Sequence, residues 1–188
     1  MAQKDPNPQG KGLSTVLDGL AQSRPGIVVP PKQIDQISSE LFTSLFILKS
    51  EFRFRPVVGK SYWLYRTGGR FKLLMLPPDQ WSAGHPGQYI GECVLQEDIT
   101  WTLTLSEAAA ADESLLRLIE EERQKLESSL QEADTVEDAM PEYIASMPFY
   151  CRLLAYGLGG SLRSSMRAAG INALTYEEAK GLLTHDPS

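Results

Sequence analysis

The sequence has few of the residues that carry reactive chemistry. Its 188 residues include only two cysteines and two histidines. Cys93 and Cys151 fall in different predicted elements, so the sequence indicates no disulfide framework. His85 and His185 lie too far apart in the chain to supply the closely spaced ligands of a zinc site. We therefore expect neither a metal site nor a cofactor.

A long apolar run is also absent. The most apolar window, residues 41–48, is interrupted by Thr43 and Ser44 and is far shorter than the roughly 20 residues that cross a bilayer. Residues 1–12 are polar and rich in proline, glycine and lysine, whereas a secretory signal needs an apolar stretch. These absences predict a protein that makes no membrane contact and is located in the cytoplasm.

Charge is unevenly distributed along the chain, whose formal net charge is −6. Residues 32–72 hold eight Lys and Arg against three Asp and Glu, whereas residues 107–142 hold twelve Asp and Glu against three Lys and Arg. The acidic total argues against non-specific binding of nucleic acid by the whole chain, because phosphate neutralisation needs a basic surface. The two segments either pack against each other or present separate faces to separate partners.

Periodic patterns predict one helix followed by four strands. From residue 32 to about residue 52, apolar side chains recur every three or four positions, which is typical of an amphipathic helix. Strands are predicted over residues 62–66, 70–76, 88–95 and 99–105, with Gly68 and Gly69 in a hairpin turn between the first two. Period-two alternation places Tyr62 and Trp101 in the core. The simplest closure is an antiparallel meander with the helix over one face.

The remainder of the chain is predicted to be helical. Ser106 caps an acidic helix, a further helical stretch ends at Gly170, and Thr175 with Glu178 forms the capping box of a last helix. The predicted fold class is α+β: a small antiparallel four-stranded β meander with an N-terminal packing helix and a C-terminal helical extension. We divide the chain into a flexible N-terminal arm (1–31), a helix plus β module (32–105), an acidic helix and linker (106–140) and a helical tail (141–188).

Three motifs in the β module resemble those of a known family. Residues 56–65 have the pattern P-x-x-G-x-x-Y-x-L-Y, residues 78–81 the pattern P-x-x-W, and residues 98–101 the pattern D-x-T-W. In this order and spacing they resemble a widespread family of uncharacterised proteins, a domain of unknown function. The resemblance covers about residues 32–105. It implies a helical lead-in followed by strands, and it implies no activity, cofactor or catalytic residue.

Aromatic and basic side chains alternate in the β module and form the candidate binding surface: Trp63, Tyr65, Arg66, Arg70 and Trp81. Trp63 and Tyr65 alternate with the core positions, so we expect them on the solvent face. Exposed rings can stack on bases or hold proline-rich peptides, and neighbouring arginines suit single-stranded nucleic acid. The sequence has no recognised nucleic-acid signature. The arginines would serve equally well as solubility charges or as partners of the acidic helix.

We therefore expect a non-catalytic protein-interaction module, an adaptor or scaffold that binds a protein partner or a second copy. This hypothesis predicts an exposed apolar face on residues 149–158, or on the side of the first helix that carries Phe42, Phe46 and Ile47. The alternative is a nucleic-acid-associated protein that uses the basic and aromatic sheet face. A small hydrolase or transferase built around His85 is a weaker hypothesis, because no nucleophile motif accompanies that histidine.

Overall fold

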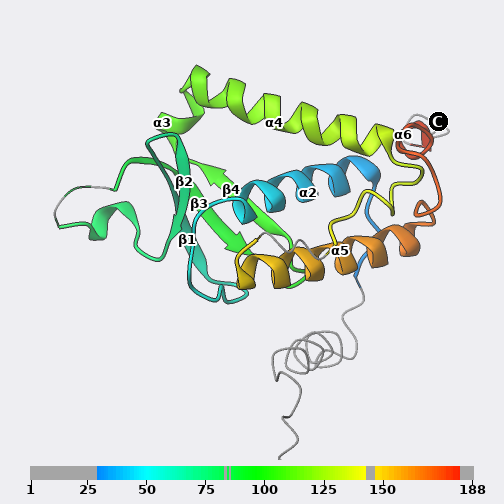
Figure 1. The fold of residues 1–188 in the computed structure, drawn as a ribbon, viewed down its shortest axis with the longest axis horizontal. Coiled ribbons are helices and arrows are strands. Elements are labelled where there is room, and N and C mark those ends of the chain that lie inside the picture. The colour runs from blue at the N-terminus through cyan, green and yellow to red at the C-terminus, as the bar shows by residue number, and fades with distance from the viewer. Residues whose placement is uncertain (1–28, 83, 85, 143–146, 183–188) are drawn as a thin grey trace, which may run out of the picture.

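The computed structural model describes residues 29–82, 84, 86–142 and 147–182. Its helices are α2 (Ile34–Leu48), α3 (Glu107–Ala110), α4 (Glu113–Glu132), α5 (Phe149–Ala169) and α6 (Tyr176–Gly181), and its strands are β1 (Ser61–Thr67), β2 (Arg70–Leu74), β3 (Gln88–Leu95) and β4 (Trp101–Leu105), with a 3-10 helix η1 (Pro78–Gln80). Figure 1 shows α2, α4 and α5 on the same side of the sheet. The segment after β2 that contains η1, residues 75–82, extends from the other side and is called the η1 loop. The predicted α+β class is confirmed. Most of the predicted N-terminal arm lies outside the described residues.

The sheet is antiparallel, with the strand order β2-β1-β3-β4. Gly68 and Gly69 make the predicted hairpin turn between β1 and β2, with φ angles of 56° and 80°, which suit a two-residue loop. The predicted meander is wrong in one connection, because β3 pairs with β1 and not with β2. The chain leaves β2 through Pro77 and Pro78, which cannot extend a ladder of backbone hydrogen bonds, and β3 then pairs with the free edge of β1.

The hydrophobic core extends over the sheet and the helices as one cluster. Tyr62 and Trp101 are buried on the sheet, as the alternation predicts. From them the cluster continues through Leu41 of α2 to Leu130 of α4 and Leu158 of α5. The core therefore crosses the predicted boundaries at residues 105 and 140. The C-terminal helices pack on the β module, a point that the sequence left open.

Local capping signals set where the helices begin and end. Ser106 caps only the single turn of α3, and Asp112 caps α4 by accepting hydrogen bonds from two backbone amides. The sequence analysis predicted one helix after Ser106 and missed the separate start of α4. Helix α5 is continuous and ends at Gly170, whose φ of 73° is the left-handed conformation expected there. The predicted capping box of Thr175 and Glu178 is present at the start of α6.

A buried ion cluster joins the start of α2 to the turn between β3 and β4. Lys32 is only 6% exposed, and its Nζ lies 2.5 Å from Glu40 Oε2 and 2.6 Å from Asp98 Oδ2. Asp98 Oδ1 accepts hydrogen bonds from the backbone amide and the hydroxyl of Thr100, at 3.1 and 2.6 Å. In the same turn Ile99 has a φ of +66°, which strains a β-branched residue. The cluster holds this turn against the helix.

The environment of the cluster shifts two pKa values. Burial alone lowers the pKa of Lys32, but the hydrogen bonds to Asp98 and Glu40 outweigh burial, so the pKa rises above its usual value. Burial alone raises the pKa of Asp98, but the hydrogen bonds from Lys32 and Thr100 outweigh it and the pKa falls. Both groups are therefore charged across the neutral range.

Candidate protein-binding surface

Two residues of the predicted binding surface meet under the η1 loop. The Tyr65 hydroxyl donates to the Leu76 carbonyl at 3.2 Å and accepts from Trp81 Nε1 at 3.1 Å. The Tyr65 ring also packs against Trp81 and Tyr89, with centroids 6.1 and 5.5 Å away. Tyr65 is fully buried, and burial raises the pKa of its hydroxyl. The expectation that Tyr65 lies on the surface is therefore wrong, because the loop after β2 folds over its face of the sheet.

The other three residues of the predicted surface do not all share one face of the sheet. Trp63 is half-buried, and Arg66, three positions later in β1, points to the opposite face of the sheet because side chains alternate along a strand. There the Arg66 guanidinium lies 6.0 Å from the centroid of the Phe71 ring, on the face that packs on α2. Arg70 is exposed and pairs with Glu51 at 3.2 Å. Because Arg66 lies on the opposite face of the sheet from Trp63 and Tyr65, the five residues do not form one continuous surface.

Within the described ranges, the structure does not bring the candidate catalytic residues together in one site. His85 and His185 lie outside the described residues, so the hypothesis of a hydrolase around His85 is not tested. Cys93 and Cys151 are buried free thiols, and burial raises their pKa values to about 12 and about 11. A reactive cysteine needs a lowered pKa. Among the described residues, no group of three His, Cys, Asp or Glu side chains could hold a metal ion.

One of the two predicted apolar faces is exposed. Phe149 and Tyr156 of α5 remain 44% and 47% exposed, and half-buried Leu153 lies between them. Spacings of four and three residues place these side chains on one stripe of the helix, which we call the α5 outer face. The other predicted face is wrong: Phe42, Phe46 and Ile47 are buried, because the sheet and the later helices enclose α2.

Contacts on its other sides fix α5 in place. Cys151, Ala155 and Leu158 are buried on the side opposite the outer face. A Cβ on Gly159 would lie 2.1 Å from the Pro141 carbonyl oxygen, so the loop before α5 approaches the helix where there is no side chain. The Ser165 hydroxyl donates to the carbonyl of Pro30 at 2.6 Å. The α5 outer face therefore belongs to a rigidly seated helix.

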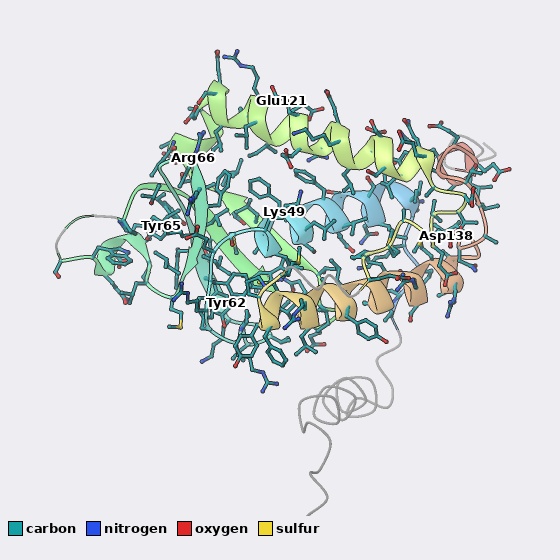
Figure 2. The ribbon with its side chains drawn as sticks, viewed as in Figure 1. Lys49, Tyr62, Tyr65, Arg66, Glu121 and Asp138 are labelled. Atoms are coloured by element: carbon teal, nitrogen blue, oxygen red, sulfur yellow. The ribbon has the colours of Figure 1, made fainter. Side chains whose placement is uncertain are left out.

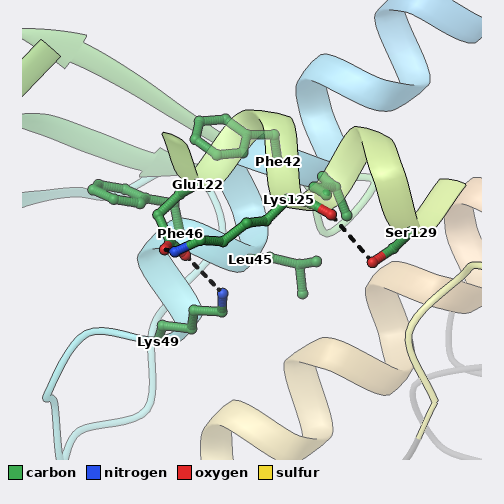
Figure 3. A pocket seen from close by; sticks show the side chains of 8 residues that line it. Phe42, Leu45, Phe46, Lys49, Glu122, Lys125 and Ser129 are labelled. Carbon is green, nitrogen blue, oxygen red and sulfur yellow. Dashed lines mark hydrogen bonds and ion pairs between the residues drawn. The ribbon is translucent and has the colours of Figure 1, made fainter. Parts of the chain in front are cut away.

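A second surface feature, which the sequence analysis missed, lies between α2 and α4. It is a groove of about 170 Å³ lined by eight side chains: Phe42, Leu45, Phe46, Lys49, Glu122, Lys125, Leu126 and Ser129 (Figure 3). The sequence did carry one signal for this groove: the apolar stripe of α2 is wider than one packing face needs. Which helix would lie beside that stripe could not be read from local patterns.

A family model matches the first part of this structure. Residues 36–122 match the model of a family described as "Protein of unknown function (DUF2452)". This match confirms the resemblance drawn from the sequence and extends beyond the sheet into the first half of α4. The α5 outer face lies outside the matched residues. No curated protein and no solved structure shows significant similarity to the chain.

None of the described helices combines the length and apolar character that a membrane crossing requires.

Proposed function

We propose that this protein is a non-catalytic protein-interaction module, and that the α5 outer face is the surface that receives a protein partner. The observation that carries the proposal is the pairing of Phe149 and Tyr156, two large aromatic side chains left almost half exposed on one stripe of a well-anchored helix. Tyrosine, tryptophan and phenylalanine are enriched in interfaces, and tyrosine and tryptophan are frequent among the few residues that carry most of the binding energy.

The exposed area of the two rings supports the same assignment. Fully burying an exposed side chain of this size is worth about 1.5–3 kcal/mol. Because Phe149 and Tyr156 are already about half buried, each would contribute about half of that to binding. A rigid helix also adds little ordering cost when it binds. Because the same core holds α5, α2 and the sheet, the β module acts in this proposal as the platform that presents the helix.

The test uses the full-length chain with single charged substitutions. Tyr156→Glu and Phe149→Glu each place a carboxylate on the α5 outer face, and Met75→Glu is the matched control, because Met75 is 62% exposed on the far loop. Proteins captured from a cell extract by the wild type are identified, purified and measured for binding to each variant by calorimetry. We expect both α5 variants to weaken binding at least tenfold while the control binds as the wild type does.

Two results would contradict the proposal. One is a partner that binds the α5 variants and the control with equal affinity. The other is a set of captured proteins that does not differ between Tyr156→Glu and Met75→Glu. Circular dichroism of each variant establishes that its fold is intact, and sedimentation of the wild type shows whether the partner is a second copy of the chain.

A further inference from the structure

Helix α4 has its fully buried side chains near its two ends. Of its twenty residues only Leu115 and Leu130 are buried, and at 1.5 Å per residue they lie about 22 Å apart along the helix axis. Between these anchors α4 runs beside α2 (Figure 1). The groove described above lies in this interval, where Leu118, Ile119 and Leu126 are partly buried against the core, and its walls come from both helices.

The floor of the groove is apolar and aromatic. The rings of Phe42 and Phe46 are stacked, with centroids 5.9 Å apart, and half-buried Leu45 and Leu126 line the groove from the two helices. The volume of about 170 Å³ is close to that of a cavity of about 150 Å³ known to accept benzene. The groove therefore has room for one ring-sized apolar group.

The rim of the groove is positively charged. Lys49 and Lys125 are 61% and 70% exposed, and both pair with the single carboxylate of Glu122, at 3.3 and 2.6 Å. The hydrogen bond from Lys125, together with Lys49, holds the pKa of Glu122 below its usual range, so this carboxylate is ionised at pH 7. Arg123 lies beside the groove, with its guanidinium 5.0 Å from the centroid of the Phe42 ring and its Nε 3.8 Å from Glu120 Oε2. Among the side chains that line the groove, two ammonium groups and one carboxylate leave one positive charge on a chain of net charge −6.

We propose that this groove binds a short acidic segment of a partner protein, with one phenylalanine-sized side chain between Leu45 and Leu126. The carboxylates beside that side chain pair with Lys49 and Lys125. Charge complementarity selects this partner, because the two ammonium groups share one carboxylate and have donor capacity left for others. The acidic outer side of α4, which includes Glu121 (Figure 2), opposes a long polyanion but not a segment with a few carboxylates. The proposal stands independently of the α5 outer face.

The test measures fluorescence anisotropy of three labelled peptides with the full-length protein. In the first peptide one Phe is flanked on each side by two Glu; in the second Ala replaces the Phe; in the third Lys replaces each Glu. We expect the first peptide to bind, the second to bind about ten- to a hundredfold more weakly because the buried ring is lost, and the third not to bind. Binding of the first peptide should weaken as salt rises, because exposed charges are screened.

Single variants locate the binding site. Lys125→Glu and Lys49→Glu should each weaken binding of the first peptide about tenfold, whereas Lys60→Glu, the same charge change at an exposed lysine before β1, should leave it unchanged. Leu45→Glu should abolish binding. Because Lys125 is exposed, its variant should keep the native circular dichroism spectrum, so a folding defect in Leu45→Glu cannot decide the outcome.

The proposal is overturned if the three peptides bind alike, or if no peptide binds at millimolar concentration. It is equally overturned if Lys60→Glu weakens binding as much as Lys125→Glu does. A wild-type dimer that Lys125→Glu converts to a monomer would show that a second copy of the chain occupies the groove instead.

Discussion

Replacing Lys32 with methionine tests the importance of the buried ion cluster. Methionine keeps most of the apolar stem of the side chain and removes the ammonium group, with its charge and its hydrogen-bond donors. In the wild type the ammonium group pairs with Glu40 and Asp98, whose side chains are 23% and 18% exposed. Removing one partner from a fully buried pair costs about 3–5 kcal/mol. Because both carboxylates retain some contact with water, we expect Lys32→Met to lower the free energy of unfolding by about 2–3 kcal/mol.

The assay is equilibrium unfolding in urea at pH 7, followed by tryptophan fluorescence, which reports on buried Trp101. A loss of 2–3 kcal/mol corresponds to a decrease in Tm of roughly 5–10 °C for a chain of this size. Lys60→Met is the matched control, because Lys60 is exposed, and it should change the free energy of unfolding by less than about 0.5 kcal/mol.

The pH dependence of the same difference is a second check. The folded-state pKa of Asp98 is lowered, so its contribution to stability is present above its unfolded pKa of about 3.9 and is lost as the pH falls through the folded value. The pKa of Lys32 is raised, so its contribution is complete below about pH 10.4 and is lost only as the pH rises through the folded value. The difference between wild type and Lys32→Met should therefore be constant from about pH 5 to 10 and should shrink below pH 4. A loss of less than about 1 kcal/mol at pH 7, or a difference that is the same at pH 3 and pH 7, would refute this account of the cluster.

Three further predictions concern packing, reactivity and capping. Gly159→Ala should destabilise the protein by about 1–3 kcal/mol, because the new Cβ meets a backbone carbonyl oxygen. Gly160→Ala has open space at the Cβ and should stabilise the protein by about 0.5–1 kcal/mol. Chemical denaturation of both variants tests this difference, and equal effects would contradict the packing described at Gly159. Cys93 and Cys151 should resist Ellman's reagent in the native protein and react on unfolding, since burial raises both pKa values; rapid native labelling would show that one is accessible. Thr175→Ala should cost about 1 kcal/mol and speed amide exchange in α6, and unchanged exchange there would count against the capping box.

The sequence by itself determined the local features of this protein. The hairpin at Gly68 and Gly69, the capping box at Thr175 and the C-cap at Gly170 each depend on backbone conformations or hydrogen bonds within a few residues. The inward direction of Tyr62 and Trp101 follows from strand alternation, which is equally local. Such signals were readable because each is contained in one element or one turn.

Tertiary structure alone decided the features that join distant segments. Strand β3 could pair with β1 or β2, and local sequence does not distinguish the two edges of a hairpin. Tyr65 alternates as a solvent-facing residue should, yet the η1 loop covers it. Lys32 and Asp98 are far apart in the chain, and the groove exists only because α4 lies beside α2. Each of these depends on which long-range packing buries the most apolar surface while satisfying its polar groups, and that competition takes place over the whole chain.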